Sequence, residues 1–439
     1  MEMLPKNIDG ALAALEDAGY EAYIVGGSVR DRAIGREVSD YDVTTSALPE
    51  EVEKVFAKYK VIETGIAHGT VTVVIDGSPI EITTFRSDGE YLDSRHPESV
   101  TFTRKIEDDL ARRDFTMNSI AVDRRGKTVD PYGGMEDISR GVVRCTGDPD
   151  TRFGEDALRI IRALRFSSTL GFEIESGTAE SIHKNRGKLL NISVERVYSE
   201  LKKLLCGKDV YRILTDYSDV ICTLIPEMTP AIGFDQKSKY HCYDVYTHIA
   251  KSVEAIEPDP VLRLSMLFHD IGKPYVCTEE DGVRHFKGHP DVSEKIAERW
   301  FAAMHSDAET ARLVVLFCKL HDRPIVPEKK PVKRLLTIFT YDELLMFCKI
   351  YRADSVAHAP EYRERAKTAD KIAAIAEEIV RENECFSLRD LAVNGNDMTS
   401  LGLSGPEIGE ALHELLSLVI DEELPNDKEA LIEYIKKKR

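Results

Sequence analysis

The hydrophobic pattern of the amino-acid sequence changes once, near Asp148, and this change divides the chain into parts of different fold class. Before it, short β-branched runs alternate with helical stretches, which predicts a first helix at about 8–18 and several strands. The expected strands cover residues 21–25, 41–45, 71–75, 80–85 and 119–123. After it, apolar residues recur at helical spacing. The sequence therefore predicts an α+β protein, with a small mixed-sheet head followed by an all-helical neck, body and tail.

The same pattern predicts four parts along the chain. These are a head domain over 1–147, a helical neck over 148–215, a histidine-rich helical block over 216–360, and a helical tail region over 361–439. We expect one helix over 153–170 to open the neck and Gly171 to end it. Residues 182–212 hold eight Lys or Arg and three acidic residues inside a protein of net charge −18. This segment is either a solvated helix face or a surface that binds a polyanion.

Composition excludes several classes of protein. No apolar run approaches the roughly 18 residues that a membrane-spanning helix needs, and residues 1–6 lack the layout of a signal peptide. The eight cysteines are scattered without a Cys-x-x-Cys pair, which predicts reduced thiols and disfavours a zinc ribbon or a disulfide framework. We therefore expect a cytoplasmic protein with no membrane partner. The negative total charge does not exclude nucleic acid, because phosphate contacts need only a local basic surface.

A glycine pair and two aspartates follow the first two expected strands. Gly26-Gly27-Ser28 lets the backbone approach a ligand, and the helix that should start near Val29 offers free N–H groups to an anion. Asp40 and Asp42 stand two residues apart on the next strand, so their carboxylates should converge on one face. Such a pair repels unless a cation lies between its members, and carboxylate oxygens suit Mg²⁺. Glu81 is either a third carboxylate of this group or a solvent-facing strand residue.

Two Mg²⁺ ions held in this way can activate an attacking hydroxyl and stabilise a leaving phosphate. The residues therefore predict a nucleotidyl-transfer site with Asp40, Asp42 and Glu81 as its candidate catalytic and metal-binding groups.

Several motifs in order sharpen this prediction, over about the first 220 residues. They are 26–31 (GGSVRD), 40–42 (DYD), 64–70 (TGIAHGT), 84–86 (TFR), 109–118 (DLARRDFTMN), 130–134 (DPYGG) and 155–159 (EDALR). The series resembles the polymerase beta-like nucleotidyltransferase superfamily. Within it, the series is similar to the bacterial class II tRNA nucleotidyltransferases, the CCA-adding enzymes, and to their poly(A) polymerase relatives.

The resemblance implies which residues bind the nucleotide. Arginine forks clamp phosphates, and Asp and Asn side chains can bind ribose hydroxyls. The implied set is Gly26, Gly27, Ser28, Arg30, Arg112, Arg113, Asp114, Asn118, Asp156, Arg159 and Arg162. A structural alternative for the central motif is an Arg–Asp pair that ties a strand to the neck. The resemblance also implies a mobile loop over 87–104 needed for the final A, with Arg95 and His96 as contacts.

Asp156 and Arg159 suggest how C and A are selected. At i and i+3 of a helix they should project from one face, and an Arg donor beside an Asp acceptor matches cytosine and adenine. Uracil and guanine would leave buried polar groups unpaired, at about 1–3 kcal/mol each. The alternative is an ordinary surface salt bridge, worth about 0.2–0.5 kcal/mol. Arg162 and Arg165 extend the same helix, either as further contacts or as surface charges.

A second constellation lies in the histidine-rich block. His269-Asp270 ends an apolar helix, and adjacent His and Asp side chains can both bind one divalent metal ion. With His248 and Asp354 they complete a pattern that resembles the HD phosphohydrolase superfamily. That resemblance implies a metal-dependent phosphatase or cyclic phosphodiesterase, or a retained fold without chemistry, and it leaves the metal open. His285, His289 and His321 can bind a second metal or a phosphate.

The leading hypothesis is an enzyme that adds C, C and A to the 3′ end of tRNA. It would use CTP and ATP without a nucleic-acid template, release pyrophosphate, and grip the tRNA acceptor arm with its neck and body. A poly(A) polymerase and a partial CC- or A-adding enzyme share the catalytic residues and stay open. From other classes, the chain is a phosphohydrolase with a nucleotide-sensing head, or an RNA-binding module; the intact carboxylates argue against the latter. The oligomeric state is left open.

Overall fold

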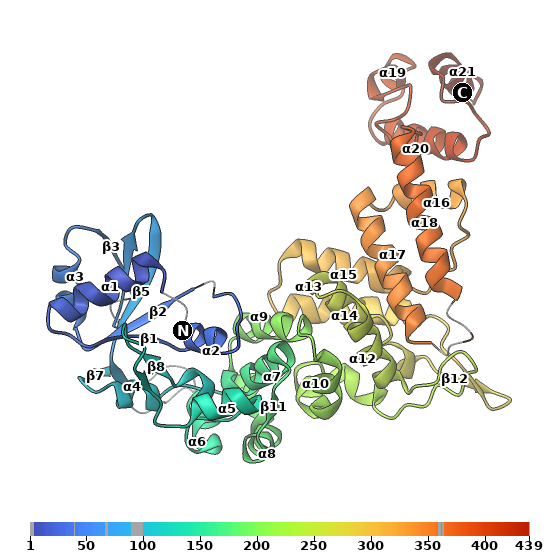
Figure 1. The fold of residues 1–439 in the computed structure, drawn as a ribbon. Coiled ribbons are helices and arrows are strands. Elements are labelled where there is room, and N and C mark those ends of the chain that lie inside the picture. The colour runs from blue at the N-terminus through green and yellow to red at the C-terminus, as the bar shows by residue number, and fades with distance from the viewer. Residues whose placement is uncertain are drawn as a thin grey trace. The chain divides into compact units, whose positions relative to one another are not determined.

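The structure, a computed structural model, describes residues 4–38, 40–65, 69–88, 100–358, 361 and 364–438. It divides into two compact units, Met1–Pro226 and Glu227–Arg439 (Figure 1). The first combines a sheet with helices, and the second is almost entirely helical. The predicted α+β class is confirmed. The division into four parts is finer than these two units and stays a prediction.

A seven-stranded sheet forms the head, in the order β3-β4-β5-β2-β1-β8-β9. Every neighbouring pair is antiparallel except β2 with β5, so the sheet is mixed, as predicted. The strands are β1 (Ala22–Val25), β2 (Asp42–Thr45), β3 (Lys60–Gly65), β4 (Thr70–Ile75), β5 (Ser78–Thr84), β8 (Ala121–Val122) and β9 (Thr128–Val129). All five expected strands are present, and β3 and β9 are additional. A separate two-stranded ribbon pairs β6 (Arg86–Asp88) with β7 (Val100–Phe102).

The strand register decides which side chains share a face of the sheet. Val25 is paired with Asp42, and Asp42 with Glu81, so these three side chains project from the same face. Val25 packs there with Phe85 and with Ile106 of α4 (Ile106–Ala111), so an apolar cluster holds α4 on this face beside the polar group. The helices α1 (Lys6–Asp17) and α3 (Pro49–Val55) complete the head, together with the short helices α2 (Gly27–Ala33) and α5 (Gly134–Arg140).

After the head, the first unit contains six α-helices: α6 (Pro149–Glu155), α7 (Leu158–Leu170), α8 (Ser176–Asn185), α9 (Val194–Leu205), α10 (Val210–Asp216) and α11 (Ser218–Leu224). The prediction of one helix over 153–170 is wrong, because Asp156 has an extended backbone (φ −138°, ψ 102°) that separates α6 from α7. Gly171 ends α7 with φ 69°, as predicted, since a left-handed residue suits glycine.

The second unit is built mainly from helices, and buried aromatic side chains form part of its core. Its first helices are α12 (Val245–Ala255), α13 (Pro260–Phe268), α14 (His289–Ala303) and α15 (Ala308–Leu320), and a hairpin of β12 (Thr278–Glu280) and β13 (Val283–His285) lies between α13 and α14 in sequence. They continue with α16 (Lys329–Leu336), α17 (Tyr341–Val356) and α18 (Glu364–Arg381). The last are α19 (Gly395–Ser400), α20 (Pro406–Ile420) and α21 (Lys428–Lys438). Phe268, Phe301, Phe317 and Phe347 are fully buried.

The ends of two of these helices position the histidine site. The Asp244 and Asp259 side chains accept hydrogen bonds from the first backbone N–H groups of α12 and α13, respectively. These caps fix where α12 and α13 begin; α12 carries His248, and the His269-Asp270 pair directly follows α13. Among the described residues, no helix is long and apolar enough to span a membrane.

Candidate functional site

Three carboxylates meet at the start of β2. Asp42 is the first residue of this strand, and Glu81 lies directly opposite it on β5. Asp40 precedes β2, so the prediction that Asp40 and Asp42 lie on the same strand is wrong. The negative charge of Asp40 nevertheless acts on Asp42, whose pKa it helps to raise. All three residues are exposed, so a cation from solvent can reach them.

The electrostatics of Asp42 reflect this crowding. Desolvation by the surrounding protein raises its pKa, the Arg113 guanidinium lowers it, and the neighbouring charges of Glu81 and Asp40 raise it further. The net shift is upward. A carboxylate whose pKa is raised partly by two other carboxylates is stabilised when a cation binds among them.

Gly26 allows the arginine to approach this group. Its backbone has φ 69° and ψ −130°, and a Cβ added here would lie 3.1 Å from Arg113 Nη1 and 3.9 Å from Asp42 Oδ2. Helix α2 follows at once, so it starts two residues earlier than the predicted Val29. The Ser28 hydroxyl donates to the Val25 carbonyl (2.9 Å), which ties the first turn of α2 to β1.

Replacing Gly26 by alanine should therefore reduce both stability and nucleotide addition. A side chain at positive φ costs about 1 kcal/mol or more, and the added Cβ would push Arg113 from its place. We expect at least about a tenfold loss of addition, the effect of about 1.4 kcal/mol. Gly35→Ala is the control, because Gly35 has φ 70° but nothing within 4 Å of an added Cβ. Urea unfolding and initial rates measure the two effects. Equal activity losses in both variants would contradict the role given to Gly26.

Asp109 holds both arginines of the central motif, and the sequence prediction missed it. Its Oδ1 accepts from Arg112 Nη2 (2.7 Å) and its Oδ2 from Arg113 Nη2 (3.0 Å). Asp109 is fully buried; burial raises its pKa, but the Arg113 and Arg112 guanidiniums outweigh this, and the net pKa is lowered. Asp109 lies three residues before Arg112 and four before Arg113, and this helical spacing could have indicated the two ion pairs.

Asp114 links the head to the neck. Its Oδ2 accepts from Arg162 Nη2 (2.6 Å), and its Oδ1 from Asn118 Nδ2 (3.0 Å). Asn118 Oδ1 in turn accepts from Arg30 Nη1 (2.7 Å), so the four side chains form one chain of hydrogen bonds. The Arg–Asp tie to the neck, the structural alternative in the sequence analysis, is thus present as Asp114–Arg162. Arg30, Arg162 and Arg165 also lie over the ring of Phe166.

This buried pair predicts a pH dependence of stability. Burial raises the Asp114 pKa, but Arg162 and the Asn118 hydrogen bond outweigh it and lower the pKa to about 2. The folded-state pKa of Asp114 lies below the unfolded value of 3.8, so ionised Asp114 stabilises the folded state by about 2 kcal/mol. This stabilisation is complete above pH 4 and is lost as the pH falls towards 2. Asp114→Asn should therefore destabilise the protein at pH 7 by at least this amount, and by less below pH 4. Denaturant unfolding at several pH values measures the difference, and a pH-independent difference would contradict it.

The two predicted base-selecting residues do not share a helix face. Asp156 lies in the break between α6 and α7, whereas Arg159 lies within α7. Asp156 Oδ2 accepts from Arg196 Nη2 (3.0 Å) on α9. Arg159 is buried; its Nη1 donates to Glu155 Oε2 (2.7 Å) and its Nη2 to the Arg112 carbonyl (2.8 Å).

The expectation based on i, i+3 spacing is therefore wrong in its geometry. Within the described part of the chain, Asp156 and Arg159 form no ion pair with each other, which also removes the surface salt bridge alternative. Arg196 anchors Asp156 and Glu155 anchors Arg159, and neither anchor was among the predicted site residues. Arg159 Nη2 also donates to the Arg112 carbonyl, which places Arg159 beside the two arginines that are predicted to bind phosphate.

The predicted metal ligands His248, His269, Asp270 and Asp354 are brought together in the second unit. All four are buried, and one ligand atom from each lies within 4.8 Å of the others. His248 Nε2 is 3.1 Å from both Asp270 Oδ2 and Asp354 Oδ1, and His269 Nε2 is 3.3 Å from Asp270 Oδ2. These elements start far apart in sequence, so the fold itself assembles the group.

The other oxygen of Asp270 faces a second group. His289 Nε2 and His321 Nε2 lie 3.2 and 3.4 Å from Asp270 Oδ1. Asp270 therefore stands between two pairs of histidines, and the three residues form a second candidate metal group. His285, the other residue proposed for this role, is exposed at the end of β13 and belongs to neither group.

Backbone carbonyls fix the orientation of these rings. The Nδ1 atoms of His269, His289 and His321 lie 2.7, 2.8 and 2.7 Å from the carbonyl oxygens of the residues three positions earlier. An Nδ1–H donated to a carbonyl leaves the Nε2 lone pair for a metal ion. Burial lowers the pKa of His269, but the Asp270 and Asp354 carboxylates raise it to about 10. The group thus attracts positive charge, whether a proton or a metal ion.

Family models match most of the chain. The model of the poly A polymerase head domain matches residues 22–144, and that of a "probable RNA and SrmB-binding site of polymerase A" matches 171–230. The HD domain model matches 239–381, and a model of domain 2 of tRNA nucleotidyltransferases matches 330–435. The three carboxylates of the head and the ligands of the HD group lie inside matched regions.

Relatives of known activity agree with these matches. The CCA-adding enzyme of Geobacillus kaustophilus is 52% identical over 210 residues, 48% of this chain and 52% of the relative. That of Lactobacillus helveticus is 50% identical over 208 residues, 47% of this chain and 52% of the relative. The matched segment thus spans about half the length of these curated relatives.

A solved structure covers nearly the whole chain. The crystal structure of the Bacillus stearothermophilus CCA-adding enzyme in complex with CTP matches with a TM-score of 0.76 and 30% identity. The match covers 99% of this chain and 98% of that one. The chain therefore belongs to the CCA-adding enzyme family of tRNA nucleotidyltransferases and carries an HD domain.

Proposed function

We propose that this protein adds C, C and A to the 3′ end of tRNA from CTP and ATP without a nucleic-acid template. The observation that carries the proposal is the convergence of Asp40, Asp42 and Glu81 beside Arg113, with Arg159 in contact with the adjoining backbone at Arg112. Arg113 thus adjoins a carboxylate, and its neighbour Arg112 adjoins a residue that would read the base.

The carboxylates fit Mg²⁺, because they are exposed and converge, and because Glu81 and Asp40 help to raise the pKa of Asp42. Asp40, Asp42 and Glu81 would hold it, and the bound metal would supply charge neutralisation at the reacting phosphate. Arg112 and Arg113 would bind the triphosphate. The 3′ oxygen of tRNA would attack the α-phosphorus, and the bond to pyrophosphate would break.

Separate anchoring suits Asp156 and Arg159 to base selection. A guanidinium has five N–H donors, and the bonds of Arg159 to Glu155, the Arg152 carbonyl and the Arg112 carbonyl use three. Its remaining donors would face the acceptors of cytosine and adenine, and Asp156 would accept from the exocyclic amino group. Because both side chains are held in place by their own partners, a wrong base would leave hydrogen-bonding groups unpaired, which costs binding free energy.

Arg159→Ala should therefore relax the choice of nucleotide. We expect the preference for CTP over UTP, measured as a ratio of kcat/KM values, to fall by about 10-fold or more, the effect of 1–3 kcal/mol. Arg186→Ala is the control, since Arg186 lies in the neck and pairs with Asp219. A variant that loses rate equally for all four nucleotides would contradict a role in selection.

The proposed partner is the tRNA acceptor arm, and the neck is the proposed contact surface. Among the described contacts of the basic segment 182–212, Lys184, Arg186, Arg196 and Arg212 are ion-paired within the protein. Lys188, Lys202, Lys203 and Lys208 form no such pair in the described part of the chain. These four lysines are the charges available to phosphates, so the binding surface is narrower than the sequence count suggests.

We also propose a second activity, metal-dependent hydrolysis of phosphate esters, either monoesters or cyclic diesters, at the HD group. Buried imidazole and carboxylate ligands suit transition metals, and Asp270 is placed to bridge two of them, with His289 and His321 on the second. A cavity of about 340 Å³ opens beside them, lined by Lys273, Arg284, Lys287 and Arg365. Positive side chains at a metal group favour a phosphate substrate.

Poly(A) polymerase and partial CC or A addition remain the alternatives, because they share the carboxylates. Arg95 and His96, which bear on addition of the final A, lie outside the described residues. The proposed location is the cytoplasm, in keeping with the eight cysteines, all of which are free thiols.

A further inference from the structure

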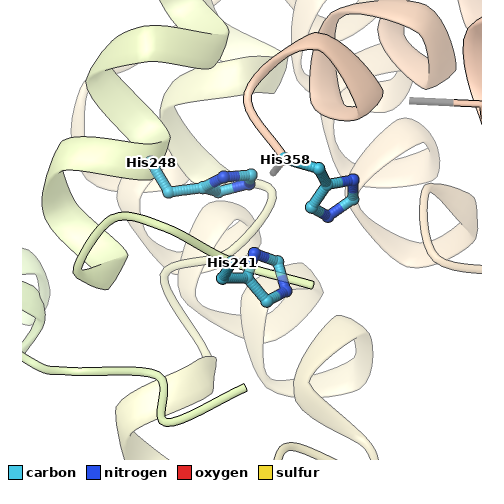
Figure 2. A group of neighbouring side chains, drawn as sticks. All are labelled: His241, His248 and His358. Carbon is cyan, nitrogen blue, oxygen red and sulfur yellow. The ribbon is translucent and has the colours of Figure 1, made fainter. Parts of the chain in front are cut away.

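A third group of side chains adjoins the HD group and shares His248 with it, whereas its other two members, His241 and His358, have no part in either proposed activity. His248 lies on α12, His241 lies in the segment that precedes this helix, and His358 follows α17 (Figure 2). Their rings face one another, with centroids 4.6 Å apart for His241 and His358, 5.2 Å for His241 and His248, and 5.4 Å for His248 and His358.

These distances suit a metal ion. Since a metal–nitrogen bond to histidine is about 2.0–2.1 Å, three imidazoles around one tetrahedral ion have ring centroids roughly 5 Å apart. One nitrogen of each ring lies within 4.8 Å of the others. His248 and His269, both in the predicted HD ligand set, have a similar centroid distance of 5.3 Å.

One nitrogen in the group has no partner. His241 Nδ1 is buried and makes no hydrogen bond to any described residue. A buried nitrogen without a partner costs free energy that a bound metal ion would recover. His241 and His358 also line the 340 Å³ cavity, together with Asp270 and Asp354 of the HD group, so an ion in this cavity can reach either group.

His248 is shared between the two groups. Its Nε2 faces Asp270 and Asp354, while its Nδ1 is 3.4 Å from the Ala357 carbonyl. The matching contacts of His269, His289 and His321 are 2.7–2.8 Å, so His248 has the weakest backbone anchor of the four rings. It is therefore the ligand most easily drawn from one group to the other.

We propose that His241, His248 and His358 form an inhibitory transition-metal site, which withdraws His248 from the HD group when it fills. Three imidazoles without a carboxylate favour Zn²⁺, Ni²⁺ or Cu²⁺ over Mg²⁺. The HD group would keep His269, Asp270 and Asp354 but lose one ligand. The inhibition rests on the proposed hydrolase activity, whereas the binding of metal does not.

The test is a Co²⁺ and Zn²⁺ titration of the full chain. Wild type is compared with His241→Gln, His358→Gln and the control His413→Gln, an exposed residue of α20. Visible absorption of bound Co²⁺, Zn²⁺ bound at equilibrium dialysis, and hydrolysis of p-nitrophenyl phosphate are measured on the same samples. Circular dichroism confirms that each variant is folded.

We expect two phases in wild type and the control: the first fills the HD group, and the second fills the site of His241, His248 and His358. The second phase should add one Zn²⁺ per chain and suppress phosphate release. It should weaken by more than about 10-fold in His241→Gln and His358→Gln, a loss seen even for residues that only support metal ligands. Nucleotide addition in Mg²⁺ should not change.

Two results would overturn the site: identical titrations in all four proteins, or loss of the first phase in both histidine variants, which would assign His241 and His358 to the HD group itself. If the second phase disappears in both variants while wild type never releases phosphate, the metal site stands and the hydrolase proposal fails.

Discussion

Replacing Asp42 by alanine is expected to abolish nucleotide addition, with a loss of at least about 10³-fold, and to leave phosphate release at the HD group unchanged. The charges of Glu81, Asp40 and Arg113 all shift the pKa of Asp42, so Asp42 is central to the group. A catalytic metal ion supplies several kcal/mol of transition-state stabilisation, and each 1.4 kcal/mol is about tenfold in rate.

Single-turnover addition to a tRNA substrate measures this effect. Asp17→Ala, which removes an exposed carboxylate at the end of α1 in the same head, is the matched control. Asp42→Asn separates charge from side-chain volume and should lose nearly as much activity. Addition that survives in Asp42→Ala would show that the metal assignment is wrong.

Replacing His269 by alanine is expected to have the converse effect. Its Nε2 faces both Asp270 and Asp354, so its removal leaves a metal ion without one of its four predicted ligands. We expect phosphate release and metal retention to fall by at least about 10²-fold, while nucleotide addition continues.

Because His269 is fully buried, the alanine variant can also lose packing. His269→Gln keeps most of the volume, and His413→Gln is the exposed control. Metal content after gel filtration and p-nitrophenyl phosphate hydrolysis are the readouts. A folded His269 variant that loses nucleotide addition as well would contradict two independent sites.

Features fixed by short-range pattern were predictable from the sequence. The strands around Gly26, Asp42 and Glu81 follow from β-branched runs, and the His269-Asp270 pair from its place at the end of an apolar helix. Glu81 was ambiguous because alternation alone does not say which face of a strand points to a neighbour. The parallel pairing of β2 with β5 places it opposite Asp42.

Features that depend on distant partners were not predictable. The backbone at Asp156 is extended, so Asp156 and Arg159 do not have the positions that a continuous helix would give them. Arg196, forty positions later in the chain, is the hydrogen-bond partner of Asp156. Helical periodicity continues across the break, so no sequence pattern marks it. The proximity of His241 and His358 was likewise not predictable, because these residues flank α12 and α17 and come together only when the two helices pack.

Burial also changed the meaning of some charges. Arg165, expected as a contact or a surface charge, lies over Phe166 and 3.1 Å from Glu200 Oε2, and burial with the neighbouring Arg162 lowers its pKa to about 10. A sequence pattern counts a charge but does not show whether the fold has already paired it.

The most direct measurement uses tRNA that lacks its last three nucleotides, incubated with Mg²⁺ and CTP alone, ATP alone, both, or UTP or GTP, with products resolved at single-nucleotide length. CCA addition predicts two additions with CTP, one more when ATP is also present, and none with UTP or GTP. A long ladder with ATP alone would instead show a poly(A) polymerase. No extension at all, from enzyme that still releases phosphate at the HD group, would contradict the proposed nucleotidyl transfer.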